Sequence, residues 1–113
     1  MKRLSTHILD LTRGMPAGDV PVRLERQIQP GNWHALNSAR TDGDGRCAQL
    51  LPDGEWSSGL YRLVFDTASY FSALKIEGLY PVVEVTFRVR DGDSQFHIPL
   101  LLTANGYTTY RGS

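Results

Sequence analysis

The last eighteen residues constrain the fold of this chain most, because they combine an alternating strand, a tight turn and a second strand. Residues 96–102 alternate a mixed set with an apolar set, which is Phe96, Ile98, Leu100 and Leu102. This period of two is typical of a strand that presents one face to a core. Asn105-Gly106 is a hairpin signal, and the β-branched and aromatic residues 107–110 favour a second strand. We therefore expect the chain to end in a β-hairpin.

After this hairpin come Tyr110, Arg111, Gly112 and Ser113, which bring a phenol, a guanidinium, a hydroxyl and a terminal carboxylate. A chain terminus usually frays unless something holds it. Polar chemistry at such a place indicates either a disposable tail or one that is tied into the fold.

The same alternation recurs along the rest of the chain. Further strands are expected at residues 4–10, 20–28, 33–40, 60–66 and 80–90. One short helix is expected, beginning at Asp66 or Thr67 and running to Lys75. Residues 41–56 form a long irregular stretch rich in Asp and Gly, and such loops are often functional. Seven to eight strands joined by short turns predict an all-β sandwich with one short helix.

The alternation also predicts which residues face the core. On residues 4–10 the inward set is Leu4, Thr6 and Ile8. On residues 60–66 it is Tyr61, Leu63 and Phe65. Residues 20–28 separate a polar set from Val20, Val22, Leu24, Arg26 and Ile28.

Length and composition favour a single domain over residues 1–113, because no linker rich in Pro, Gly or Ser divides the chain. Twelve basic and twelve acidic residues balance, which argues against a nucleic acid or a membrane surface as partner. The single Cys47 excludes an internal disulfide and a cysteine-based zinc site. The sequence has no hydrophobic signal region and no apolar run of membrane-spanning length, so we expect a soluble cytoplasmic protein.

Three polar side chains are candidates for a common site. If the inward assignments hold, His7, His97 and Tyr110 project from the outer surface of one sheet. Two imidazoles and a phenol suit a site that moves protons near neutral pH. A histidine on a strand is, however, more often merely exposed than catalytic, and periodicity alone leaves both interpretations open.

The sequence offers little for a metal ion or a cofactor. Asp42-Gly43-Asp44-Gly45 begins like a calcium loop, but Arg46 and Cys47 follow where that loop needs a ligand and a glycine. His7, His34 and His97 lack a metal-site spacing. No phosphate-binding or dinucleotide motif occurs, so we expect neither a metal nor a cofactor.

Both ends of the chain carry a family resemblance. Ser5-Thr6-His7-Ile8-Leu9-Asp10, followed by residues 13–17, resembles the first strand and loop of the transthyretin family. The ending Tyr110-Arg111-Gly112-Ser113 resembles the tetrapeptide of its enzymatic branch, the 5-hydroxyisourate hydrolases. The resemblance implies a transthyretin-like sandwich that pairs by edge strands into dimers. It further implies a homotetramer, a dimer of dimers, with the sites at the dimer–dimer interface.

The resemblance also implies an activity and a set of site residues. The activity is hydrolysis of 5-hydroxyisourate in purine degradation, with an imidazole as general base and no metal. The implied catalytic residues are His7, Arg46, His97 and Ser113, and the implied substrate-binding residues are His7, Arg46, Tyr110 and Arg111. Which histidine is the base stays open. The alternatives are a transthyretin-like carrier of a small hydrophobic ligand and a purely structural sandwich module.

Overall fold

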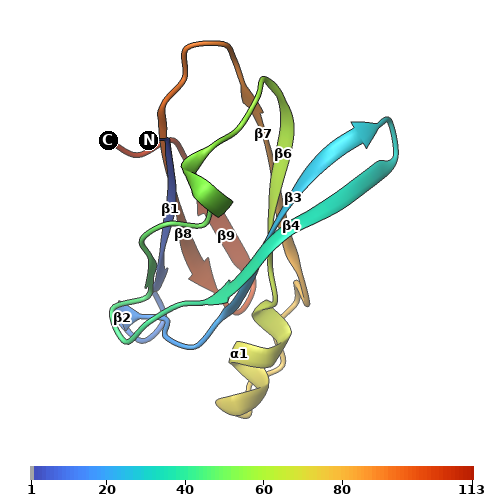
Figure 1. Cartoon of the computed structure of the whole chain (residues 1–113). Helices are drawn as coiled ribbons and strands as arrows, with labels where there is room; N and C mark the ends of the chain where they lie inside the picture. Colours follow the sequence, from blue (N-terminus) through green and yellow to red (C-terminus); the bar gives the residue numbers. More distant parts are fainter. Residues whose placement is uncertain (1) are drawn as a thin grey trace.

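The computed structural model describes residues 2–113, and they form a sandwich of two β-sheets (Figure 1). One sheet has the strand order β2-β1-β8-β9, with β5 also pairing with β1, and the other has the order β4-β3-β6-β7. The strands are β1 (Arg3–Asp10), β2 (Met15–Pro16), β3 (Pro21–Gln29), β4 (Asn32–Arg40), β5 (Arg46–Cys47), β6 (Gly59–Phe65), β7 (Val83–Val89), β8 (Gln95–Thr103) and β9 (Gly106–Thr109). The all-β sandwich predicted from the sequence is confirmed.

The strand count agrees with the prediction once length is considered. Seven of the strands have four residues or more, and they cover the segments that the alternation predicted. The other two, β2 and β5, have two residues each and lie in segments expected to be loops. Both pair with β1, at Leu9 and Asp10 and at Thr6 and His7, while β8 pairs with the other side of β1 from Arg3 to Asp10.

The predicted inward faces meet between the two sheets. Leu4, Thr6 and Ile8 of β1 are buried, as are the apolar set of β8 and the inward set of β6. Each fully buried Leu, Ile or Phe side chain contributes about 1.5–3 kcal/mol relative to an exposed one. Packing in this core therefore holds β1 against β8 and β6, although these strands are far apart in sequence.

The alternation fails in the second half of β3. The register with β4 shifts between Leu24 and Glu25, which marks a bulge. The extra residue is Leu36 of β4, whereas β3 keeps its register with β6 through this point. Glu25 therefore stays on the outer face with Arg23, yet it is only 7% exposed. Ile28, which shared a set with the core residues of this strand, is 55% exposed. In this part the β3–β4 hairpin extends beyond the sandwich, as the cyan strands show (Figure 1).

The helix α1 (Thr67–Ala73) was predicted close to its observed bounds. Asp66 caps it, because its carboxylate accepts hydrogen bonds from the backbone N–H and the hydroxyl of Ser69. The helix ends before Lys75, whose positive φ of 59° is not helical. Its Tyr70 hydroxyl donates to the buried Asp10 carboxylate at 2.6 Å, which fastens α1 to the end of β1. Across residues 2–113, no helix has the length and apolar character needed to cross a bilayer.

The outer face of the second sheet carries a nearly buried carboxylate. Glu25 accepts hydrogen bonds from Arg23, at 2.7 Å, and from Arg62. The Arg62 guanidinium also lies 4.3 Å from the centre of the Trp33 ring. Burial alone raises the pKa of Glu25, but the hydrogen bonds from Arg62 and Arg23 outweigh it and lower the pKa below its ordinary value. Glu25 is therefore charged in the folded protein and holds β3 against β6.

We expect Glu25→Gln to lower the free energy of unfolding at pH 7 by about 1–3 kcal/mol, because two guanidinium groups lose their charged acceptor. Since folding lowers the pKa of Glu25, its stabilising effect is present above the ordinary pKa of 4.5 and disappears as the pH falls through the folded value. Urea unfolding at pH 7 and at pH 3 measures both effects. The control is Glu84→Gln, because the Glu84 side chain is 48% exposed and its carboxylate lies 3.5 Å from Arg62, and it should cost less than about 1 kcal/mol. Equal losses for the two variants would contradict the assignment.

Candidate functional site

The parallel pairing of β1 with β8 brings the two predicted histidines onto one face. The register places Ser5 opposite His97 and His7 opposite Pro99. Because even-numbered residues of both strands point into the core, His7 and His97 lie on the outer face of this sheet. Both are half-buried. The Ser5 hydroxyl lies 2.8 Å from Nδ1 of His97, which orients the imidazole ring.

Arg46 reaches the same face from the long loop. Strand β5 pairs antiparallel with β1 and sets Arg46 opposite His7. The preceding loop is organised by Asp42, whose carboxylate accepts the backbone N–H groups of Asp44 and Arg46. Gly45 has a φ of +75°, and a Cβ there would lie 2.4 Å from the carbonyl oxygen of Ile8. The glycine thus allows the loop to lie against β1.

The Asp-rich segment therefore acts as a turn. Among the described residues, no three His, Cys, Asp or Glu side chains are grouped so that they could hold a metal ion. Cys47 is buried, and this burial, together with the charge of Asp42, raises the pKa of its thiol.

The C-terminal tail is held against His97. Strand β9 pairs with β8 up to Leu100 opposite Thr109. Continuing this register would set Tyr110 opposite Pro99, which has no N–H to donate, and the Thr109 hydroxyl donates to the Pro99 carbonyl instead. Two residues later the register resumes, because the Gly112 N–H donates to the His97 carbonyl at 2.7 Å. The tail is tied into the fold, which answers the question left open by the sequence.

These elements enclose a polar pocket of about 260 Å³. It is lined by Arg3, Ser5, Thr6, Arg46, Cys47, Ala48, Gln95, His97 and Ser113. Of the residues predicted from sequence, the structure thus brings Arg46, His97 and Ser113 together. His7 lies beside them, opposite Arg46 and close enough for its charge to act on His97.

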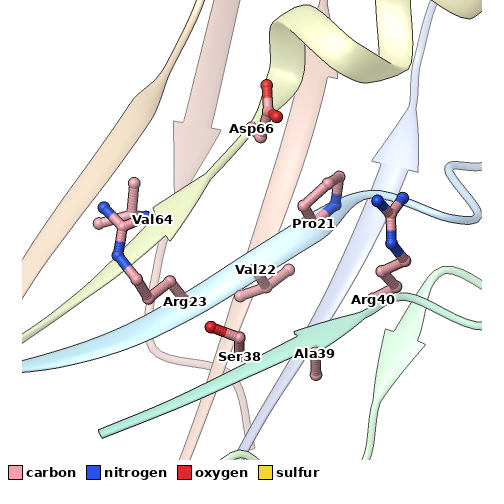
Figure 2. A pocket seen from close by; sticks show the side chains of 8 residues that line it. All are labelled: Pro21, Val22, Arg23, Ser38, Ala39, Arg40, Val64 and Asp66. Carbon is pink, nitrogen blue, oxygen red and sulfur yellow. The ribbon is translucent and has the colours of Figure 1, made fainter. Parts of the chain in front are cut away.

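A larger hollow of about 540 Å³ lies on the other sheet (Figure 2). Its lining comes from β3, β4, β6 and the residue before α1, and includes the charged side chains of Arg23, Arg40 and Asp66 (Figure 2). It contains no histidine and none of the predicted site residues. The chemistry therefore points to the smaller pocket on the first sheet.

Tyr110, which the sequence placed on the outer face with the histidines, is not among the residues that line the polar pocket of the single chain. Regular pairing with β8 ends at Thr109, one residue before Tyr110. Tyr110 lines a small apolar hollow with the inward residues Phe96 and Ile98, and is 54% exposed. Arg111 also points elsewhere: its guanidinium donates to the Gln95 carbonyl at 3.0 Å and lies 4.0 Å from the centre of the Phe96 ring.

The surroundings of His97 favour its neutral form. Burial first, then the positive charge of Arg46 and the nearby His7, lower the pKa of His97 below its ordinary value of 6.5. A neutral imidazole at physiological pH is able to accept a proton or to donate its remaining N–H. The pocket therefore combines a neutral imidazole with a permanent cation.

Sequence reasoning did not select six of the nine lining residues, among them the polar Ser5, Arg3 and Gln95. Ser5 was placed on the same face as His7, but nothing in the local sequence pairs it with His97. Arg3 and Gln95 lie opposite each other at the ends of β1 and β8, a relation that depends on the strand register. The outward alternation of β1 was the one available indication for Arg3 and Ser5.

We expect Arg46→Met to raise the pKa of His97, because the loss of a nearby positive charge stabilises the imidazolium. The midpoint should stay below 6.5, since burial still favours the neutral ring. NMR titration of the histidine ring protons measures this shift. The control is Arg3→Met, which removes a guanidinium from the same pocket and should move the midpoint less. An unchanged midpoint in Arg46→Met would contradict the assignment.

The lowered pKa of His97 also predicts how stability depends on pH. The unfolded chain takes up a proton at His97 near pH 6.5, before the folded protein does. The contribution of His97 to the free energy of unfolding is therefore lost as the pH falls from 6.5 through the folded value.

Gly112→Ala tests how closely the tail lies against the imidazole. The added Cβ would lie 2.7 Å from Cδ2 of His97, so either the ring or the tail has to move. We expect shifted ring resonances of His97 and faster hydrogen exchange at the amide of residue 112. In the control Gly106→Ala, the nearest atom to the new Cβ is Thr103 Oγ1 at 3.7 Å, so His97 should be unaffected. The same His97 spectrum in both variants would refute the close packing of the tail.

Comparisons with known proteins agree with this geometry. The model of the HIUase/Transthyretin family matches residues 4–112. The 5-hydroxyisourate hydrolases of Salmonella dublin and Mus musculus are each 43% identical to this chain over 97% of its length, and the match covers 80% and 94% of their own lengths.

Solved structures show the same fold. The 5-hydroxyisourate hydrolase of Klebsiella pneumoniae superposes with a TM-score of 0.86 at 33% identity, covering 98% of this chain and 99% of the other. Transthyretin from Sparus aurata superposes with a TM-score of 0.90 at 29% identity, covering 99% and 97%. The chain thus belongs to the HIUase/Transthyretin family.

Proposed function

We propose that this chain hydrolyses 5-hydroxyisourate to 2-oxo-4-hydroxy-4-carboxy-5-ureidoimidazoline, a step of urate degradation. The observation that carries the proposal is a single pocket that joins His97, Arg46 and Ser113, with His7 beside it. The relatives that are 43% identical over nearly the whole chain and are called 5-hydroxyisourate hydrolase support it.

The reaction needs a water molecule, a proton acceptor and a group that stabilises negative charge. Water attacks a ring carbonyl carbon while one imidazole takes its proton, and the carbonyl oxygen becomes an oxyanion. The carbon–nitrogen bond of the ring then breaks, the nitrogen receives that proton, and the carbonyl carbon becomes a carboxylic acid. His7 and His97 are the proposed proton acceptor and its partner, and no metal ion takes part.

Arg46 and Ser113 have distinct proposed roles. The Arg46 guanidinium stabilises the oxyanion through charge-assisted hydrogen bonds, and it keeps His97 neutral. Ser113 closes one side of the pocket and orders its hydrogen-bond network. Arg111 supports this role indirectly, because its contacts with Gln95 and Phe96 anchor the tail.

The proposed assembly is a homotetramer, a dimer of dimers, with the sites between the dimers. Strand β7 is one edge of its sheet and β9 is one edge of the other, and edge strands present unpaired backbone groups. Tyr110 lies away from the pocket of its own chain and is half exposed. Its proposed contact with substrate therefore requires the assembled form. The cytoplasmic location expected from the sequence stays a prediction.

The carrier alternative comes from the same fold. A sea bream transthyretin in complex with thyroxine superposes with a TM-score of 0.90 at 30% identity. The pocket of this chain, however, is lined by two arginines, a histidine and a glutamine, which are poor partners for an apolar ligand. The hydrolase is therefore the favoured function.

The decisive measurement is the ultraviolet decay of 5-hydroxyisourate, generated in place by urate oxidase, with and without the protein. We expect faster decay with the protein, and a loss of about 10²–10⁴-fold when the histidine that accepts the proton is replaced by alanine. The double variant His7→Ala, His97→Ala should decay at the spontaneous rate.

The third histidine provides a matched control. His34 is exposed on β4 of the other sheet, so His34→Ala should keep full activity. Spontaneous decay with folded wild-type protein would overturn the hydrolase proposal. A thyroxine titration of the same sample would then decide whether the carrier alternative takes its place.

A further inference from the structure

The contact between Ser5 and His97 goes beyond the residues that the proposed function uses. The two residues are 92 apart in sequence, and the parallel register of β1 and β8 sets them directly opposite. The Ser5 hydroxyl oxygen lies 2.8 Å from Nδ1 of the imidazole, which is a full hydrogen bond. The direction of this bond therefore determines which ring nitrogen of His97 carries the proton of the neutral imidazole.

The direction of the bond follows from where each hydrogen has an acceptor. A neutral imidazole has one N–H donor and one nitrogen that accepts. Within residues 2–113, the Ser5 hydroxyl makes no hydrogen bond other than the one with His97. If Nδ1 accepts this hydroxyl hydrogen, both groups are satisfied and the ring proton resides on Nε2. In the reverse direction, the Ser5 hydroxyl hydrogen is left without an acceptor in the protein.

The neighbouring residue of β1 shows the same arrangement on the inner face. The Thr6 hydroxyl donates to the carbonyl oxygen of Ile98 at 2.6 Å. Two successive hydroxyl groups of β1 thus reach two successive residues of β8, one on each face of the sheet. The carbonyl of Ile98 is only able to accept, so at this position β1 is the donor strand.

The group bonded to Nδ1 also distinguishes between two roles for His97, a general base and a hydrogen-bond donor. In a serine-protease triad, the histidine that acts as base is held by a carboxylate, which accepts the Nδ1 proton and stabilises the imidazolium. Ser5 is neutral and has a proton to give, so it stabilises the imidazolium poorly and the neutral ring well. The other charged side chains that line the pocket are Arg3 and Arg46, which disfavour an imidazolium.

We propose that Ser5 is a positioning residue whose hydroxyl donates to Nδ1 of His97 and fixes the Nε2–H tautomer, so that His97 donates a hydrogen bond to the substrate carbonyl oxygen. His97 then keeps its proton throughout the reaction. The proton of the attacking water passes to His7 and from there to the departing ring nitrogen. This assignment of roles rests on the proposed hydrolase function, but the tautomer itself is a property of the free protein.

The first test uses the free protein and needs no substrate. Two-dimensional ¹H–¹⁵N NMR of the histidine rings at pH 7.5 distinguishes the two tautomers, and the spectrum of His97→Gln assigns the signals of His97. We expect a protonated Nε2 and an unprotonated Nδ1. A protonated Nδ1 in the wild-type protein would overturn the proposal, whatever the activity.

The second test removes the hydroxyl. In Ser5→Ala, the His97 ring should populate both tautomers, and kcat should fall by about 10- to 10²-fold, less than the ~10²–10³-fold cost of losing an oxyanion donor outright. Ser5→Thr keeps a hydroxyl and should restore both the tautomer and most of kcat. Because rescue depends on the hydroxyl, a merely structural role of Ser5 would not give this pattern.

Thr109→Val is the matched control. It removes a hydroxyl that bonds β8 from the other side, at the Pro99 carbonyl, so it should leave the His97 tautomer unchanged. If Ser5→Ala retains the wild-type tautomer and kcat, the proposal fails while the hydrolase stands. If the expected tautomer is found but 5-hydroxyisourate decays at the spontaneous rate, the hydrolase fails and the role of Ser5 in ordering His97 stands.

Discussion

The parallel pairing of β1 with β8 is the constraint on which the rest of the structure depends. It runs in register over eight residue pairs, from Arg3 with Gln95 to Asp10 with Leu102. Its inner face supplies core residues of one sheet, and its outer face supplies both histidines. Every other element of the site is added to an edge of this pair. A shift of one residue would exchange the two faces, so hydrophobic burial also protects the geometry of the site.

Local backbone features, a glycine in the loop before β5 and a proline–glycine pair beside β8, then complete the pocket from both sides. On the β1 side, Gly45 permits the close approach that brings Arg46 beside His7. On the β8 side, the missing N–H of Pro99 interrupts the ladder, and Gly112 resumes it opposite His97. Neither device contributes a functional side chain. Their effect is to bring Arg46 and the residues of the C-terminal tail to the sheet face that carries both histidines.

The same sandwich is used by carriers and hydrolases, so the fold does not decide the function. What distinguishes this chain is the polarity of one patch on the outer sheet surface. The imidazole of His97 is partly desolvated beside a permanent cation, and this keeps it uncharged at neutral pH. The stabilising polar interactions of the fold lie elsewhere, around Glu25 on the opposite sheet and around Asp10 at the end of β1. The charged groups that stabilise the fold are thus different residues from those that line the polar pocket.

The sequence by itself determined the sandwich, the inward faces and the helix cap, because alternation and capping are local and survive in any register. It also placed His7 and His97 on one face for the same reason. It did not reveal the bulge between β3 and β4, the absence of Tyr110 from the polar pocket of the single chain or the bond between Ser5 and His97. Each of these depends on which residues of distant strands lie opposite one another. That register is set by the packing of the whole core, and only the tertiary structure decided it.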